Sequence, residues 1–214
     1  MIGSRLRVHP MIEIGILMAL MLAFSQAKAA SSAPPCNSSK ARTLASSGQI
    51  RIFRFPAQGK QGPVFTCRRP DGKSWRLGPS PEKGWSAAVP GPFAIKNQWA
   101  GGVERRQVGQ DTVELFSAAR NAISGGSRAH CLIGGADRPE QLPDVLRLFS
   151  APDGSIVWVV QARHGTATNQ IAVCEDSGTK VIAEGPGVQA QSVTLTNFVL
   201  TWHDETGKHS LTLK

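Results

Sequence analysis

The sequence predicts an all-β fold of about four small antiparallel sheets, arranged as a partial or small β-propeller. Two observations predict it. Short apolar runs alternate with turn sequences rich in Gly, Pro, Asp and Asn, which is typical of strands rather than helices. A short module with one tryptophan also recurs through the second half of the chain, with Trp99, Trp158 and Trp202 at matching places. A two-sheet β-sandwich is the alternative architecture.

The domain is expected to span residues 49–214 as four units, at about 50–78, 91–133, 143–184 and 192–213. In the first unit, strands at 50–55, 63–68 and 74–77 surround a tight turn with a positive-φ glycine at Gly72. In the second unit, 112–116 is a strand, 118–126 starts a helical turn, 127–133 is an outer strand and 134–141 is a linker. In the third unit, Ile156–Val160 is apolar on both faces, which predicts a strand inside a stacked array.

The N-terminus has the pattern of a secretory signal peptide over residues 1–29. Arg5 and Arg7 precede an apolar run, and Ala27-Lys28-Ala29 is a cleavage box. The alternative, a membrane anchor, needs about 20 apolar residues, and this run is shorter. Residues 30–48 are expected to be a flexible linker and N-terminal tail. The chain is therefore expected to be secreted or to lie in the cell envelope, with no transmembrane span after cleavage.

Four cysteines lie in the expected mature chain, and an even number in an exported protein indicates disulfides. Four cysteines allow three pairings. We favour the short-range one, Cys36 with Cys67 and Cys131 with Cys174. It would tie the tail to the first sheet and close one unit onto the next. The sequence contains no C-x-x-C spacing, which is the pattern typical of a zinc site, so zinc binding by the cysteines is not expected.

Charge gives the main indication of a partner. The chain carries 24 Lys and Arg against 15 Asp and Glu, a net charge of +9, and the excess lies mostly between Lys40 and Arg106. Such a field attracts anionic surfaces and polymers. We expect the partner to be a protein or an anionic cell-envelope polymer, with no nucleic acid because the chain is exported. A solvated basic face is the alternative interpretation. A monomer without cofactors is expected.

One cluster combines cations with an aromatic ring beside a loop rich in proline, a combination common at binding surfaces. The predicted binding residues are Arg69, Lys73, Trp75 and Arg76, with Trp85 and Lys83 nearby. The recurring tryptophans are expected to be core residues instead, because each lies in or beside an apolar strand.

No catalytic residue and no metal ligand is predicted. The sequence lacks a G-x-S-x-G elbow, a phosphate loop and an H-E-x-x-H motif. Two S-x-x-K spacings, from Ser80 and from Ser177, fall in turns where no helix is expected. A Ser-His-Asp triad stays open for His130, His164 or His209, because triads are recognised by geometry. The last hairpin could bring His203 and His209 together with a carboxylate, as in a zinc site, but a solvated turn is favoured.

Five segments resemble a family of exported bacterial proteins that are similar to Tol-type and WD40-like propellers. They are residues 51–77, 153–158, 178–188, 192–195 and 200–202. The resemblance implies strands and turns over most of the chain and brings no catalytic residues. We therefore expect an exported, non-enzymatic binding module. The alternative is a glycan- or peptidoglycan-acting hydrolase or lyase on a propeller scaffold.

Overall fold

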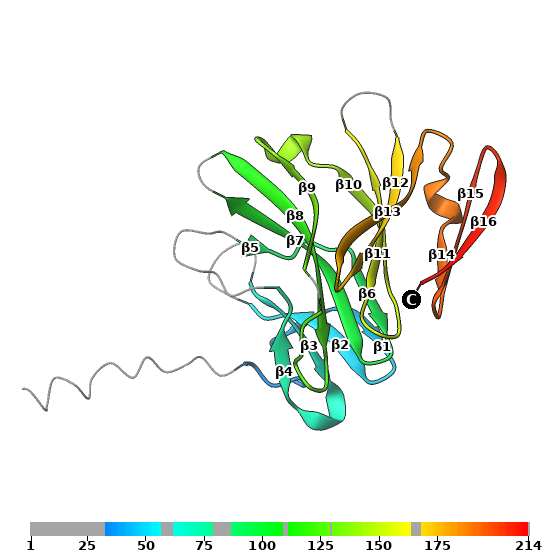
Figure 1. Ribbon diagram of the computed structural model, residues 1–214. Helices are drawn as coiled ribbons and strands as arrows, with labels where there is room; N and C mark the ends of the chain where they lie inside the picture. The colour runs from blue at the N-terminus through cyan, green and yellow to red at the C-terminus, as the bar shows by residue number, and fades with distance from the viewer. Residues whose placement is uncertain are drawn as a thin grey trace, which may run out of the picture. The chain divides into compact units, whose positions relative to one another are not determined.

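The structure is a computed structural model that describes residues 33–56, 62–78, 87–108, 111–128, 130–163 and 168–213. In these residues the backbone forms strands and short 3-10 helices and no α-helix (Figure 1). The prediction of an all-β fold is confirmed. Predictions on the signal peptide, and on Ser80, Lys83, Trp85 and His164, fall outside the described residues.

The first sheet has four antiparallel strands in the order β1 (Arg42–Ser47), β2 (Ile50–Arg54), β3 (Val64–Arg68) and β4 (Ser74–Arg76). The turn between β3 and β4 is the 3-10 helix η1 (Arg69–Asp71), which ends at Gly72 with φ of 66°. Strand β1 corrects the prediction of a flexible tail over 30–48. Its sequence has no apolar alternation, so its place depends on pairing with β2 and on contacts of Leu44 and Ala45 with the core.

The second sheet is built on two strands of 10 residues each. Its strands are β5 (Ala87–Ala88), β6 (Phe93–Lys96), β7 (Trp99–Val108), β8 (Thr112–Asn121) and β9 (Cys131–Ala136). Both β5 and β6 pair with β7. On its other side β7 pairs with β8, and β8 pairs with β9.

Two details of this sheet differ from the sequence prediction. The expected helical turn at 118–126 is wrong, because β8 continues to Asn121 in regular register with β7. The expected linker at 134–141 is partly strand, since β9 reaches Ala136. In β7, Gly101 is needed for packing and does not break the strand: a Cβ there would lie 2.5 Å from Cδ1 of Ile156 in the third sheet.

The third and fourth sheets follow the predicted units closely. After the 3-10 helix η2 (Pro139–Gln141), the third sheet has the order β10 (Asp144–Ser150), β11 (Ile156–Gln161), β12 (Asn169–Glu175) and β13 (Gly178–Gly185). After η3 (Ala190–Ser192), the fourth has only three strands, β14 (Thr194–Thr196), β15 (Val199–Asp204) and β16 (Gly207–Thr212).

The sheets pack on one another in chain order, and β11 shows this best. Ile156, Trp158 and Val160 pack against the second sheet, while Val157 and Val159 pack against the fourth. A separate apolar cluster joins the first sheet to the second. Four small antiparallel sheets are therefore present as predicted, in a propeller-like succession and not as a two-sheet sandwich. Alternate residues of a strand point to opposite faces, so an interior strand must be apolar on both.

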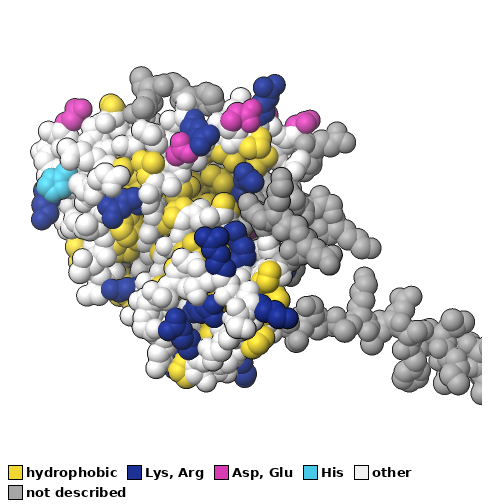
Figure 2. Space-filling view, turned by 180° about the vertical axis from the view of Figure 1, so that it is seen from behind, with side chains coloured by type: hydrophobic (Ala, Val, Ile, Leu, Met, Phe, Trp, Pro, Cys, Tyr) yellow, Lys and Arg dark blue, Asp and Glu magenta, His cyan; other side chains and the backbone are white. Residues whose placement is uncertain are grey.

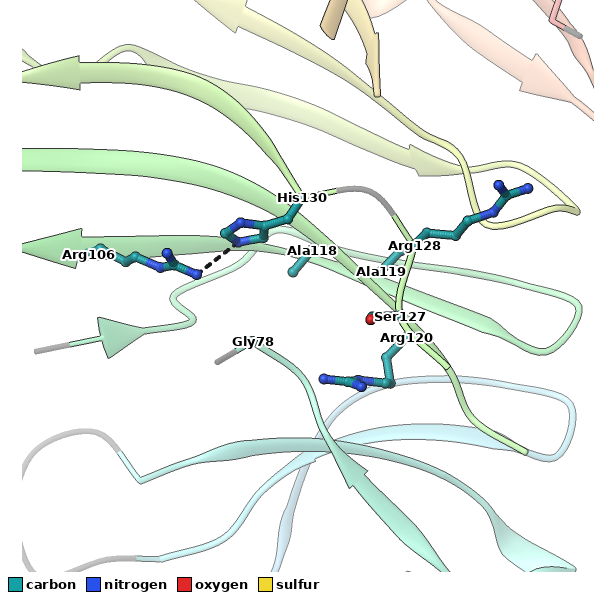
Figure 3. A pocket seen from close by; sticks show the side chains of 8 residues that line it. All are labelled: Gly78, Arg106, Ala118, Ala119, Arg120, Ser127, Arg128 and His130. Atoms are coloured by element: carbon teal, nitrogen blue, oxygen red, sulfur yellow. Dashed lines mark hydrogen bonds between the residues drawn. The ribbon is translucent and has the colours of Figure 1, made fainter. Parts of the chain in front are cut away.

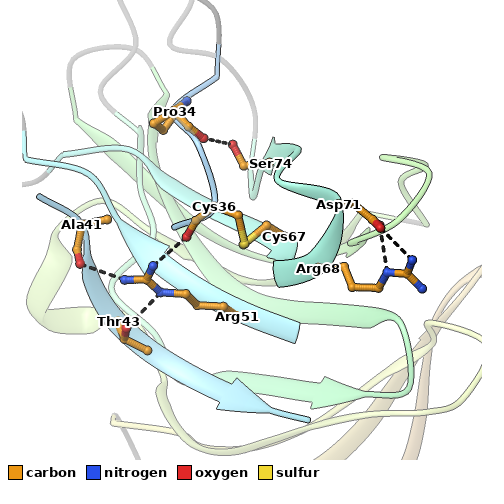
Figure 4. The surroundings of a disulfide bond; sticks show 9 residues. All are labelled: Pro34, Cys36, Ala41, Thr43, Arg51, Cys67, Arg68, Asp71 and Ser74. Carbon is orange, nitrogen blue, oxygen red and sulfur yellow. Dashed lines mark hydrogen bonds and ion pairs between the residues drawn. A yellow bond between two sulfur atoms is a disulfide. The ribbon is translucent and has the colours of Figure 1, made fainter. Parts of the chain in front are cut away.

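Both predicted disulfides are present. Cys36 pairs with Cys67 and fixes the tail to β3, and Cys131 pairs with Cys174 and joins β9 to β12. Arg51 holds the same tail by donating to the carbonyls of Cys36 and Ala41 at 2.7 and 2.8 Å (Figure 4). Disulfides persist in oxidising compartments, so the pair indicates an extracytoplasmic environment.

Candidate functional site

The four predicted binding residues do not form one surface. Arg69 begins η1 and Lys73 follows it, and both are exposed. Trp75 and Arg76 are both half-buried. As neighbours in β4, these two point to opposite faces of the sheet. A Cβ added at Gly125 would lie 2.4 Å from the Trp75 ring, so the ring packs against the turn after β8. Trp75 is a packing residue, which corrects the prediction.

Other basic residues of the first sheet have structural partners. Arg54 donates to the carbonyl of Val89 at 2.9 Å, and Arg68 pairs with Asp71 at 2.7 Å. Figure 2 shows Lys and Arg gathered on the lower lobe, where the first sheet lies. The first sheet therefore carries a concentration of positive charge, although some of its guanidinium groups bond to other groups of the protein.

The other candidates from the sequence are explained by packing. Trp158 and Trp202 are buried, and Trp99 packs against the cluster between the second and third sheets. His203 and His209 lie on opposite faces of the last hairpin, because His209 is opposite Trp202 and His203 is opposite Lys208. Within the described residues no group of three or more His, Cys, Asp and Glu side chains could hold a metal ion.

A cleft of about 180 Å³ opens instead on the face of the second sheet that is turned toward the first (Figure 3). Strand alternation assembles it. Glu104 and Arg106 of β7 share this face with Phe116, Ala118 and Arg120 of β8, because Glu104 pairs with Phe116 and Arg106 with Glu114. The small side chain of Ala118 leaves space in the middle of the cleft, between Arg106 and His130 at one end and Arg120 at the other. The lining residues are Gly78, Arg106, Ala118, Ala119, Arg120, Ser127, Arg128 and His130.

One end of the cleft is closed by a buried carboxylate. Glu104 has no exposed surface, and its Oε1 accepts from Nε of Arg106 at 2.6 Å. Its Oε2 lies 3.2 Å from Nε2 of His130, which is also 3.2 Å from Nη2 of Arg106. Phe116 supports both side chains: the His130 ring stacks on it at 4.6 Å and the Arg106 guanidinium lies over it at 4.7 Å. Glu104 thus fixes Arg106 and His130 in place.

The other end of the cleft is Arg120, whose guanidinium donates to two main-chain carbonyls. Nε donates to the carbonyl of Arg76 at 3.1 Å, and Nη1 donates to the carbonyl of Gly125 at 2.8 Å. No ion pair to Arg120 is present among the described residues. Burial lowers the pKa of the Arg120 guanidinium, and it lowers that of nearby Arg76, where the charge of Glu104 acts in the opposite direction. Arg120 therefore holds a partly desolvated positive charge that no carboxylate among the described residues balances.

Arg128 differs from Arg120 because its charge is balanced. It pairs with Asp153 at 3.2 Å and with Asp176, and it points away from the cleft toward the β10–β11 turn (Figure 3). Arg106 is balanced by Glu104. The remaining positive charge of the cleft thus lies at Arg120, and a single anionic group placed over Ala118 would meet Arg120 on one side and Arg106 and His130 on the other.

The sequence pattern did not point to Glu104, Arg106 or Arg120, and it offered His130 only as a triad member. A weak signal was present, since Glu104 is a lone carboxylate directly after Ala100-Gly101-Gly102-Val103. The position of Glu104 in the interior of a sheet follows only if residues 99–108 form one strand, and the two glycines obscure that strand in the sequence.

Comparison with models of known protein families gives no match, and comparison with curated proteins gives none either. The site is therefore interpreted from its own geometry. No helix in the described part of the chain is long and apolar enough to cross a bilayer.

Proposed function

We propose that this protein is an exported, non-enzymatic binding module that holds an anionic cell-envelope polymer through the cleft between Arg106, Arg120 and His130. The signal-peptide pattern at residues 1–29 and the two disulfides support export. The resemblance to exported propeller-like proteins supports the same class. These features favour a ligand outside the cytoplasm, where acidic glycans, wall polymers and phospholipid head groups supply anions.

The observation that carries the proposal is the state of Arg120. In the described part of the chain Arg120 has no ion-pair partner. A partly buried cation in that state is unfavourable, and an anionic ligand group would restore the balance. A guanidinium also has donors in a rigid fork that matches a carboxylate or phosphate. Two donors of Arg120 are already fixed by main-chain carbonyls, so the guanidinium is oriented before the ligand arrives.

Cleft size favours one group of a polymer over a whole small molecule. Pockets for drug-sized ligands are about 300–1,000 Å³. The cleft is about 180 Å³ and accommodates a single charged substituent. The rest of a polymer would run over the basic first sheet, where Arg69 and Lys73 are exposed. Those contacts would be weak and screened by salt, so the cleft supplies the specific part of binding.

The enzymatic alternative has less support. Glycoside hydrolysis commonly uses two carboxyl groups that flank the bond to be broken. The described lining of the cleft contains no carboxylate. Glu104 lies behind Arg106 and His130, fully buried and already in contact with both. A carboxylate held in this way orients the neighbouring side chains and does not reach a substrate.

Binding to two soluble polyanions tests the proposal. Polygalacturonate presents carboxylates and polyphosphate presents phosphates, so the two distinguish the anionic group. We expect Arg120→Gln to weaken binding of the preferred polymer at least about tenfold, the loss of roughly one charge-assisted hydrogen-bonded group. Arg69→Gln, an exposed change of the same charge, should alter it by less than about twofold.

A second variant separates folding from binding. Arg120→Lys keeps the charge but loses the fixed fork, so it should bind between the wild-type protein and Arg120→Gln. Thermal unfolding of each variant shows whether the fold survives. The proposal fails if Arg120→Gln is folded and binds both polymers as the wild-type protein does, or if the wild-type protein binds neither. A loss confined to Arg69→Gln would assign binding to the outer basic face.

A further inference from the structure

The fourth sheet ends on an open strand. The first and third sheets have four strands and the second has five, but the fourth stops at β16 with three. Strand β16 pairs with β15 on one side, and within the described residues no strand lies on the other. An unpaired edge presents free backbone N–H and C=O groups to any extended chain that approaches.

This edge differs from the other long edges of the molecule. Natural sheets protect edges with bulges, short strands or charges. The edge strands β1, β9, β10 and β13 have six to eight residues each, and each has a register shift. The edge strands β4 and β14 have three residues each. In the described part of the chain, β16 alone is a six-residue edge in regular register.

The pairing with β15 determines which groups of β16 point outward. Leu213 donates its N–H to the carbonyl of Phe198 at 2.8 Å, so Leu213, Leu211, His209 and Gly207 direct their backbone groups toward β15. The backbone groups of Lys208, Ser210 and Thr212 therefore point away from the sheet. The side chains of these three residues are exposed on its outer surface.

We propose that β16 pairs antiparallel with β16 of a second copy of this chain, about a twofold axis at Ser210. The pairing would place Ser210 opposite Ser210, and Lys208 opposite Thr212 of the partner copy, so that all outward backbone groups are used. Twofold pairing of this kind is the commonest symmetry of soluble oligomers. It would extend the fourth sheet across both copies, and it does not depend on the proposed anion site.

The side chains are compatible with this register. Lys208 meets Thr212 and not another lysine, so no like charges face each other. On the inner face, Leu211 would lie opposite His209 of the partner copy. The His209 ring stacks on Trp202 at 5.2 Å within each copy. The leucine side chain would thus cover the partly exposed ring of His209, next to the buried Trp202. The contact area of one strand pair is small, so the association should be weak and dependent on concentration.

Sedimentation velocity of the purified protein, from about 10 μM to about 1 mM, tests the proposal. The wild-type protein should shift from monomer to dimer over this range. Ser210→Pro should remain monomeric, because it removes an outward N–H and no bond to β15. Ser210→Ala is the matched control: it loses the hydroxyl, keeps the N–H and should still dimerise. A monomeric wild-type protein, or a folded Ser210→Pro variant that dimerises normally, would overturn the proposal.

Charge variants test the register without proline. Thr212→Glu would face Lys208 of the partner copy and should tighten the dimer at least about threefold, while Thr212→Lys should weaken it by a similar factor. The same pair of changes at Thr196, on the opposite edge strand β14, controls for net charge. The Glu and Lys variants at Thr196 should have similar dimer affinities. If the Glu and Lys variants at Thr212 behave alike, or split no more than those at Thr196, the proposed pairing is wrong.

Discussion

Glu104 and Arg106 form the most deeply buried ion pair described in the structure, with Oε1 of Glu104 2.6 Å from Nε of Arg106 and no surface of Glu104 exposed. They are two residues apart on one strand, so their side chains lie on the same face of the second sheet. The Arg106 side chain is 19% exposed, and it lines the cleft. The pair therefore connects the interior of the sheet to the cleft.

Removing this carboxylate should destabilise the protein. We expect Glu104→Ala to lower the free energy of unfolding by about 2–4 kcal/mol, because Arg106 and His130 lose their acceptor and a void remains. Glu104→Gln keeps an oxygen for Arg106 and should cost about 1–2 kcal/mol. Urea unfolding measures both. A loss below about 1 kcal/mol in both variants would show that the carboxylate does not organise this end of the cleft.

The disulfide between the second and third sheets should contribute strongly to stability. Cys131 and Cys174 are separated by 43 residues, and loop closure of that length is worth about 4 kcal/mol by the chain-entropy model. Cys131→Ala with Cys174→Ala should therefore lose about 2–4 kcal/mol in urea unfolding. Equal stability of the double variant and the oxidised wild-type protein would contradict this role.

A glycine pair isolates the packing of Trp75. Gly125 and Gly72 have similar φ values, 78° and 66°, but a Cβ at Gly125 would meet the Trp75 ring at 2.4 Å and one at Gly72 would meet nothing within 4 Å. Both alanine variants pay for the left-handed conformation, about 1–2 kcal/mol. Gly125→Ala should lose about 1–3 kcal/mol more from the clash. Equal losses would mean that Trp75 is free to move, as a surface binding residue would be.

Asp204 gives a stability term that depends on pH. A hydrogen bond from the Thr206 hydroxyl, then one from His209, lowers the pKa of Asp204 from 3.8 to about 2. Because the pKa is lower in the folded state, the stabilisation is present above about pH 4 and is lost as the pH falls toward 2. The melting temperature of the wild-type protein should exceed that of Asp204→Asn at pH 5, and the difference should shrink toward pH 2. A difference that does not change with pH would contradict the assignment.

Strand rhythm made the four sheets predictable from the sequence. Runs such as Ile156–Val160, apolar at every position, indicate a strand covered on both faces, and the structure places it between two sheets. The shortest sequence separations among the four cysteines gave the correct disulfides.

The cleft was not predictable in the same way. Gly101-Gly102 and Ala118-Ala119 conceal two long strands, because glycine and alanine are weak strand formers that here allow close packing. Without the register of β7 and β8, nothing brings Arg106 and Arg120 to one cleft. The four predicted binding residues do not share one surface for the converse reason. Trp75 and Arg76 are neighbours in sequence, and neighbours in a strand face opposite ways.

The most direct test of the anion site follows individual arginine side chains on titration with oligogalacturonate and, in parallel, with oligophosphate of matched length. In ¹H–¹⁵N spectra, the Nε–H of Arg120 and the backbone amide of Ala118 should shift and saturate together with one of these ligands, while the Nε–H of Arg69 changes little. These atoms lie at the two places where the ligand group is expected. Saturating shifts at Arg69 and Lys73, with Arg120 and Ala118 unmoved, would contradict the account and leave the cleft as a packing feature.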